Sequence, residues 1–340
     1  MQRPCHLERS PQREQQRIGK GKSMKRLLAG LILGTCVVST ASAGDNDWTG
    51  RDELLDQFGW DLAKAEIKTQ KLGEGFYVLF GIGGNIAVSI GENGTLIVDD
   101  QFPELMPKIE AAIAKVGGDG VDFAINTHWH FDHADGNMAL GPAGTWLVSQ
   151  SKSRQKMTEA NTINLIVAKY RQEAYPSEAL PVITFDDRMS FHWNGEQIDL
   201  IHAGPAHTTG DAAVFFRGHN AVHMGDVFNN TGYPFIDADN GGEIDGMIDF
   251  CKAVLAELQP GAIVIPGHGE VTDVDTLKKY VAMLETVRGR IVKMIADGLS
   301  VEEVVAAKPT ADLDASFGDV ANSLGFVDRV YVSLKKTRSE

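Results

Sequence analysis

The stretch NTHWHFDHADGN, residues 126–137, concentrates metal-ligating side chains directly after an apolar run that is predicted to be a strand. His128 and His130 are two residues apart, so in an extended chain both side chains point to the same side. Asp132 and His133 follow at a position where a turn can aim them at a second point. Imidazole nitrogens and a carboxylate suit zinc or another first-row divalent ion. A set of surface histidines is the alternative interpretation, but four ligand-type residues within six positions favour a metal site.

Further ligands are predicted at the ends of other strands. His207 lies in GPAHTTGD after the run EQIDLIHA, Asp226 in HMGDVF after AVHMG, and His268 in IPGHGE after AIVIP. Each of these residues sits among glycines, which allow the backbone to turn sharply and to approach a site closely. We therefore expect all three side chains to join the histidine cluster.

The order of the predicted elements favours a layered α/β fold. Two blocks of short β-like runs are each followed by helical segments, which indicates two similar halves packed sheet to sheet with helices outside. A helix is predicted from about Asp273 to Gly298, because its apolar residues recur at three- and four-residue steps. A second long helix is predicted for residues 151–174, and a third for residues 246–258.

The complete pattern resembles the metallo-β-lactamase superfamily. HxHxDH, followed along the chain by His, Asp and His, is the metal-binding signature of that family, and the resemblance extends over roughly residues 66–280. It includes the strand end VDD with Asp99 ahead of the cluster. The resemblance implies a four-layered αββα sandwich whose site lies at one edge, between the two β-sheets.

The resemblance also implies a two-metal site. One zinc ion would be held by His128, His130 and His207, and the other by Asp132, His133 and His268. Asp226 would bridge the two ions, and Asp99 would steady the ligand loop through hydrogen bonds. Two zinc ions that share a water lower its pKa enough to give hydroxide at neutral pH, and this hydroxide attacks a carbonyl. Asp132 and Asp226 are the predicted catalytic carboxylates, since Asp132 can orient the nucleophile or pass on its proton.

Substrate contacts are expected from the aperiodic segment FNNTGYPFIDADNGG that follows Asp226. Long aperiodic loops in compact domains often line sites. Asn229, Asn230 and Tyr233 are candidate hydrogen-bond donors to an oxyanion. Plain turn formation by asparagine and glycine is the alternative interpretation.

The predicted function is an exported dinuclear zinc hydrolase that cleaves a lactam, lactone, ester or thioester, with β-lactamase activity as one option. A mononuclear iron dioxygenase of sulfur compounds is one alternative, and it would use one Fe²⁺ held by His128, His207 and Asp226. A non-catalytic metal-binding protein is the other. The complete second ligand set favours two metals and hydrolysis, whereas analogy of fold does not select the bond that is cut.

The N-terminal part has the order of a secretory signal. Residues 24–43 begin with Met24 and two cations, continue through an apolar run, and end in Ala-Ser-Ala, so cleavage is expected after Ala43. The apolar run is too short to span a membrane. Lipidation at Cys36 is a minor alternative, and residues 1–23 are interpreted as an upstream extension. The sequence thus predicts a periplasmic or secreted protein with a single domain, residues 44–340.

The net charge limits which partners the protein can bind, and the cysteine count excludes disulfides as a source of stability. Residues 1–43 hold 8 of the 32 basic and 2 of the 46 acidic residues, so residues 44–340 carry 24 basic and 44 acidic residues, a net charge of −20 with histidine neutral. Nucleic acid is therefore an unfavourable partner, and a small-molecule substrate is expected. Cys251 is the only cysteine in residues 44–340, so no disulfide can form within that part of the chain. The sequence does not indicate an oligomeric state.

Overall fold

The short apolar runs pair into two sheets. The computed structural model describes residues 48–318 and 320–337, so the predicted extension and signal lie outside the described residues. The first sheet has the order β1-β2-β3-β4-β5-β6-β9. Its first four strands pair antiparallel, and β4, β5, β6 and β9 pair parallel. The strands are β1 (Lys68–Gly73), β2 (Phe76–Phe80), β3 (Ile86–Gly91), β4 (Gly94–Val98), β5 (Phe123–Asn126), β6 (Trp146–Gln150) and β9 (Ile183–Phe185).

The second sheet has the order β10-β11-β12-β13-β14-β15. Because β11, β12 and β13 pair antiparallel in turn and β14 is parallel to β13, the strands β11, β13 and β14 run in the same direction. Their carboxyl ends therefore lie at one edge of the sheet. The strands are β10 (Arg188–Trp193), β11 (Glu196–Ile201), β12 (Ala213–Phe216), β13 (Ala221–His223), β14 (Ile263–Ile265) and β15 (Thr272–Asp273).

The two sheets pack face to face over a dry apolar layer. Side chains that alternate along the strands of both sheets meet there, among them Val78 and Val98 from the first sheet and Val214 from the second, and these three are fully buried. The ring centroids of Phe76, on the first sheet, and Phe216, on the second, lie 4.5 Å apart, so the two rings pack against each other across the layer. Burial of this layer removes apolar surface from water, which is the main force that holds the sheets together.

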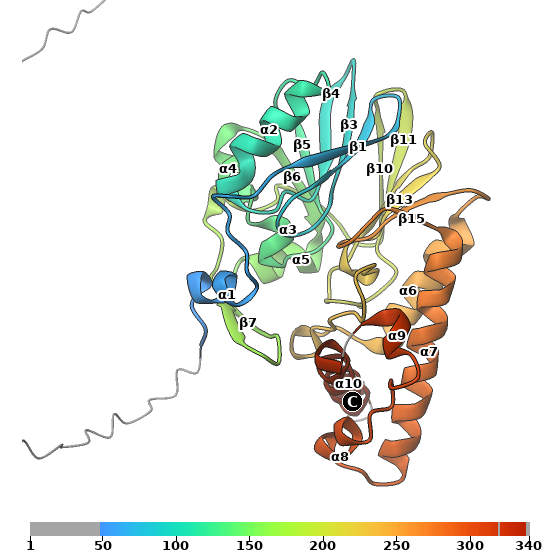
Figure 1. Ribbon diagram of the computed structural model, residues 1–340. Helices are drawn as coiled ribbons and strands as arrows, with labels where there is room; N and C mark the ends of the chain where they lie inside the picture. The colour runs from blue at the N-terminus through green and yellow to red at the C-terminus, as the bar shows by residue number, and fades with distance from the viewer. Residues whose placement is uncertain (1–47, 319, 338–340) are drawn as a thin grey trace, which may run out of the picture. The chain divides into compact units, whose positions relative to one another are not determined.

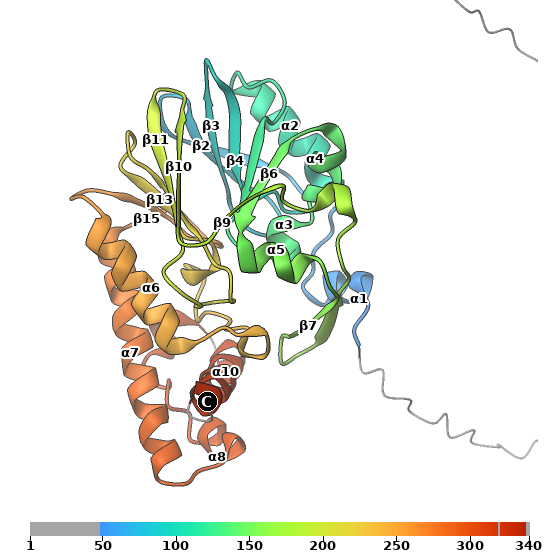
Figure 2. The same ribbon diagram turned by 180° about the vertical axis from the view of Figure 1, so that it is seen from behind.

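Helices cover the outer faces of both sheets, and the predicted αββα sandwich is confirmed. Apolar residues of α2 pack on the first sheet, and those of α6, α7 and α10 pack on the second. In both views α2 and α4 lie outside the first sheet, and α6 and α7 lie on the opposite side, outside the second (Figures 1 and 2). The helices are α1 (Arg51–Gln57), α2 (Met106–Lys115), α3 (Phe131–Ala134), α4 (Asn137–Ala143), α5 (Ser151–Met157), α6 (Ile244–Glu257), α7 (Val274–Ala296), α8 (Val301–Ala306), α9 (Asp314–Phe317) and α10 (Val320–Thr337). Short 3₁₀ turns are η1 (Pro103–Leu105), η2 (Ser177–Ala179), η3 (Gly225–Val227) and η4 (Ala238–Asn240).

The long predicted helix near Asp273 is confirmed as α7. It begins at the Asp273 side chain, which accepts a hydrogen bond from the backbone N–H of Thr276 at 2.8 Å. Its apolar stripe is buried, with Leu284 and Ile291 fully covered. Gly298, at φ +86°, follows its end. Within the described part of the chain, no helix combines the length and the apolar composition needed to cross a membrane.

The helix predicted for residues 151–174 is wrong beyond its first two turns. The segment forms α5 and then a hairpin of β7 (Asn161–Asn164) and β8 (Lys169–Gln172). The helix ends at Met157, and Asn161, the first residue of β7, donates from its side-chain Nδ2 to the carbonyl oxygen of Lys156 in the last helical turn at 2.7 Å. Ile163 and Tyr170 then bury one face of the hairpin against the helix-side core of the first sheet. Tertiary burial of this face outweighs the local preference for helix.

Candidate metal centre

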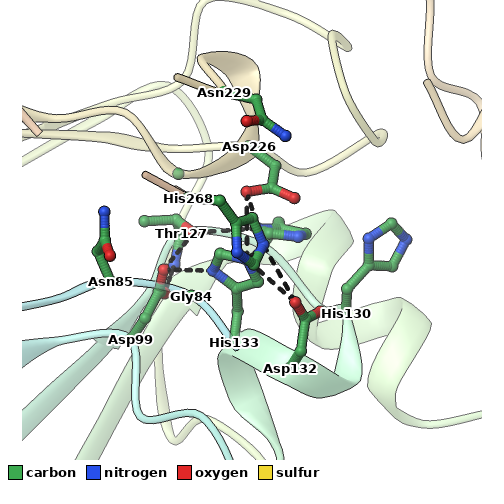
Figure 3. Close-up of polar contacts among 12 residues, drawn as sticks. Gly84, Asn85, Asp99, Thr127, His130, Asp132, His133, Asp226, Asn229 and His268 are labelled. Atoms are coloured by element: carbon green, nitrogen blue, oxygen red, sulfur yellow. Dashed lines mark hydrogen bonds and ion pairs between the residues drawn. The ribbon is translucent and has the colours of Figure 1, made fainter. Parts of the chain in front are cut away.

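Strand ends of both sheets converge on one cluster, and the structure brings all seven predicted ligands together there. The loop after β5 supplies four of them, and the loops after β11, β13 and β14 supply one each. Their nitrogen and oxygen atoms fall into three overlapping groups, and within each group the atoms lie within 4.8 Å of one another. Figure 3 labels five of these ligands, and in it the side chains of Asp132, His133, Asp226 and His268 point toward one another. The groups are His128, His130 and His207; His128, His133 and Asp226; and Asp132, His133 and His268.

The first group consists of the three imidazoles of His128, His130 and His207, whose rings are nearly perpendicular to one another. The ring of His128 lies 4.9 Å from that of His130 and 4.7 Å from that of His207 between centroids. The rings of His130 and His207 lie 4.7 Å apart. All three side chains are buried. Imidazoles that meet edge to face in this way direct their nitrogens at one point rather than stacking.

Hydrogen bonds on the outer side of each ring decide which nitrogen faces that point. His207 Nδ1 donates to the carbonyl oxygen of Phe235 at 2.8 Å, and His130 Nε2 donates to Asp237 at 3.0 Å. The remaining nitrogens, His207 Nε2 and His130 Nδ1, therefore carry lone pairs, and they face each other at 2.9 Å. Two facing lone pairs repel unless a cation lies between them.

The third imidazole of this group, His128, also directs a lone pair into the cluster. The Thr127 hydroxyl donates to Asp99 at 2.8 Å, so it accepts from His128 Nδ1 at 3.0 Å. His128 Nε2 is then an unprotonated acceptor inside the cluster, and among the described residues it has no hydrogen-bond partner. Buried polar atoms are nearly always paired. An orphaned imidazole nitrogen beside two facing lone pairs fits a metal ion.

Asp132, His133 and His268, called the second group from here on, combine two imidazoles with a carboxylate. His133 Nδ1 donates to Asp99 at 2.7 Å, which leaves His133 Nε2 facing His268 Nε2 at 3.1 Å. His268 Nε2 lies 3.1 Å from an oxygen of Asp132, and His133 Nε2 lies 3.7 Å from the same oxygen. This mixed nitrogen and oxygen set suits a first-row divalent ion.

Asp226 lies between the two groups. Its Oδ1 is 3.2 Å from His133 Nε2 and 3.5 Å from His268 Nε2. Its Oδ2 is 3.8 Å from His207 Nε2 in the first group. The two oxygens of one carboxylate thus face different ligand groups, which is the arrangement that a bridging carboxylate requires.

The two groups differ in how they hold protons. Burial lowers the pKa of His128 well below its usual range, and neighbouring imidazoles lower it further. Burial, together with His130, lowers the pKa of His207 to about 4. Burial also disfavours charge on His133 and His268, but the surrounding carboxylates, Asp226 and Asp132 foremost, together outweigh it, so the pKa of His133 rises well above its usual value and that of His268 rises to about 10. His128 and His207 therefore offer neutral nitrogens, whereas His133 and His268 hold protons that a metal ion would displace.

Two glycines allow the loops to close around the cluster. A Cβ on Gly84 would lie 2.3 Å from the His133 ring, and a Cβ on Gly267 would lie 1.9 Å from Asp226 Oδ1. Real Cβ atoms do not approach other atoms this closely, so any larger residue would displace a ligand. Gly267 is one of the glycines that flank His268 in the sequence, and this steric requirement explains its presence there.

Asp99 and Asp237 hold the cluster from outside. Asp99 is fully buried and takes a left-handed backbone at φ +64°, and it accepts from the backbone and hydroxyl of Thr127 as well as from His133. Asp237 precedes η4 and also accepts from the backbone N–H of Asn240. Sequence reasoning missed Asp237, because 107 positions separate it from His130 and the loop that carries it has no periodicity.

The three predicted substrate residues have different surroundings. Asn229 Oδ1 accepts from the N–H and hydroxyl of Thr231, while its backbone pairs with His268. Asn230 Nδ2 donates to the carbonyl of Glu270 at 2.8 Å. The Tyr233 hydroxyl donates to Asp314 at 2.8 Å, in the C-terminal helical region and not in the ligand cluster. These contacts match the alternative of turn formation for Asn229, and they leave the Tyr233 hydroxyl engaged elsewhere.

A groove opens beside His268. It has a volume of about 760 Å³, and Trp60, Ile82 and Thr231 line it together with Lys68 and Glu270, which bring opposite charges to its walls. The volume suits a small-molecule ligand. His268 thus borders this groove, whereas His128, His130 and His207 are buried.

Comparison with known proteins places the chain in a family. Residues 83–268, more than half of the chain, match the family model of the metallo-beta-lactamase superfamily. The protein belongs to this superfamily. No curated protein matches the sequence.

Similar solved structures support the fold. DIM-1 metallo-beta-lactamase is 19% identical with a TM-score of 0.53, and the match covers 66% of this chain and 99% of that one. A metallo-beta-lactamase from Pontibacter korlensis is 16% identical with a TM-score of 0.52, and it covers 65% and 99% of the two chains. TMB-1 is 15% identical with a TM-score of 0.51, covering 65% and 97%. At these identities the likeness concerns the fold alone.

Proposed function

We propose that the protein is a dinuclear zinc hydrolase that cleaves a carbonyl substrate, namely a lactam, lactone, ester or thioester. The observation that carries this proposal is the position of Asp226, whose two carboxylate oxygens face two separate ligand groups. A single-ion site would need only one of these groups. The second group, with Asp132, His133 and His268, gives the chain a complete second set of ligands.

The residues that would hold the ions follow from the outer hydrogen bonds. His128 Nε2, His130 Nδ1 and His207 Nε2 present lone pairs for the first ion, and the second group would hold the other. When bound, two such ions supply Lewis acidity that lowers the pKa of water and polarises a carbonyl. The carboxylates of Asp132 and Asp226 supply the negative charge that balances two dications.

The protein's own groups would orient the reaction. Asp132 is close to His268 and slightly exposed, at 8%, so its carboxylate can orient a water molecule and take up its proton. The fixed outer partners hold each imidazole in one tautomer and orientation. Such a preorganised cluster does not have to rearrange when charge develops in the transition state.

Zinc analysis and a substrate panel test this proposal. The purified full-length protein, supplied with zinc, should contain two zinc ions per chain and should hydrolyse at least one of a chromogenic cephalosporin, a lactone, an ester and a thioester. His128→Ala should lose one ion and the activity, whereas His192→Ala should lose neither, because His192 is an exposed histidine on β10. One iron per chain would favour the dioxygenase, and no bound metal would favour a non-metal role. Unchanged zinc content and turnover in His128→Ala would contradict the ligand assignment.

We also propose that residues 24–43 direct export to the periplasm or the medium. The support is the order of cations, apolar run and Ala-Ser-Ala in the sequence. N-terminal sequencing of the protein from native cells should find a start at Gly44. A chain that retains residues 24–43 in the cytoplasm would contradict this proposal.

A further inference from the structure

A second groove, which we call the apolar groove, is adjacent to the groove beside His268. Its volume is about 340 Å³, and none of the residues that line it carries a charged side chain. Thr231 lines both grooves. The volume is at the lower end of the range for small-molecule sites. Its walls include the apolar side chains of Phe58, Leu165, Ile166, Val167, Phe235 and Phe326.

The apolar groove is joined to the metal cluster through Phe235. The carbonyl oxygen of Phe235 accepts the hydrogen bond from His207 Nδ1. Its ring lies 5.8 Å from the His207 ring and 6.1 Å from the His130 ring between centroids. The side chain that forms one wall of the groove therefore contacts the imidazoles of the first ligand group. The shared residue Thr231 places this groove next to the groove beside His268, from which the cluster is reached.

The tip of the β7–β8 hairpin forms the outer wall and has an unusual conformation. Ile166 takes a left-handed backbone at φ +69°, and its N–H donates to the side chain of Asn164. A β-branched residue in this conformation is strained, and glycine or asparagine would relieve the strain. Ile166 is nevertheless 43% exposed and Val167 76% exposed. Because the side chains of Ile166 and Val167 contribute little to the core, core packing does not explain why apolar residues occupy these positions. A role at the groove does.

We propose that the apolar groove binds the apolar acyl group of the substrate, and that Ile166 and Val167 determine the preference for acyl length. The inference rests on the proposed hydrolase function, because it assumes that a carbonyl group reacts at the cluster. An acyl chain whose carbonyl lies at the metal centre can extend past Phe235 beneath the hairpin tip. The charged groove beside His268, with Lys68 and Glu270, is left for the polar remainder of the substrate.

A series of p-nitrophenyl esters from acetyl to octanoyl tests the inference on the zinc-loaded full-length protein. The leaving group is constant, so differences report on the acyl group. We expect kcat/KM to rise about fourfold for each added methylene until the groove is filled, which is the gain for burying one methylene. Val167→Asp should lower the ratio of octanoyl to acetyl kcat/KM at least tenfold. Val182→Asp is the matched control, since Val182 is 65% exposed and does not line the groove, and the ratio should be unchanged.

The outcomes separate the inference from the proposed function. An enzyme that cleaves the acetyl ester but shows no gain with chain length would overturn the apolar groove and leave the hydrolase function standing. If no ester is cleaved, calorimetry decides: octanoate should bind at least ten times more tightly than acetate, and Val167→Asp should abolish the difference. Equal binding of the two acids would overturn the inference. Equal loss of the ratio in Val167→Asp and Val182→Asp would also overturn it, because the effect would then come from added charge alone.

Discussion

Replacing Asp237 by asparagine should weaken one metal ion selectively. The buried Asp237 carboxylate accepts from His130 Nε2, and from both the backbone N–H and the side-chain amide of Asn240. Asparagine keeps the shape but replaces one acceptor oxygen by a donor, so one of these donors loses its partner. His130 then becomes free to carry its proton on Nδ1, the nitrogen that faces His207 Nε2 at 2.9 Å. A protonated Nδ1 cannot ligate a metal.

The magnitude follows from the position of the hydrogen bond. Loss of the outer partner of a metal-bound histidine typically weakens metal affinity about 10- to 100-fold, or about 1.4 to 2.7 kcal/mol. The second ion, on Asp132, His133 and His268, should change less, because among these ligand residues only His130 of the first group pairs with Asp237. The metal-free fold should lose about 1 to 3 kcal/mol for the buried donor left without an acceptor.

Competition between the metal-free protein and a chromogenic zinc chelator measures both binding steps. Asp199→Asn is the matched control: Asp199 accepts from the side chains of Ser190 and Arg217 on the second sheet and has no contact with the cluster. Asp237→Asn should weaken one of the two zinc-binding steps, and the control variant should weaken neither. Two unchanged zinc constants in a folded Asp237→Asn protein would refute the argument that this carboxylate sets the tautomer of His130.

Two further predictions concern protons and packing. Zinc uptake by the metal-free protein near pH 7 should release protons, because Asp226 and Asp132 together outweigh burial and raise the pKa of His268 to about 10, and the imidazole must lose its proton to ligate. Affinity should therefore rise with pH until this pKa is passed, and calorimetry in buffers of different protonation enthalpy that detects no proton release would contradict the assignment. Leu284→Ala in α7 should lower the free energy of urea unfolding by about 2 to 5 kcal/mol, because Leu284 is fully buried. The exposed Lys278→Ala on the same helix should cost under about 0.5 kcal/mol, and a similar loss in both variants would show that the stripe is not the packing face.

Features encoded within a few consecutive residues were predictable. The apolar residues of α7 repeat at helical spacing, and HxHxDH places four candidate ligands within six consecutive residues. Both features can therefore be recognised in a short stretch of sequence. The loops of His207, Asp226 and His268 were also predicted, because each follows an apolar run and each ligand lies among glycines. The direction of their strands within one sheet explains why they meet at the same edge.

Features that depend on distant partners were not predictable. The hairpin after α5 forms because Ile163 and Tyr170 bury against the first sheet, a contact that no local pattern contains. The pairing of Asp237 with His130 joins residues 107 positions apart. From the sequence, Tyr233 was a candidate hydrogen-bond donor to the substrate. In the fold its hydroxyl donates to Asp314 instead.

The sequence by itself determined the identity of the ligating groups, the strands that carry them and the layered fold, because side-chain chemistry and hydrophobic periodicity are local properties. Only the tertiary structure decided which nitrogen of each imidazole faces the centre and which side chains line the path to it. Those choices are made by hydrogen bonds and packing between segments such as the Phe235 loop and the hairpin tip at Ile166. Their positions are set by the folding of the whole chain, so short-range patterns do not encode them.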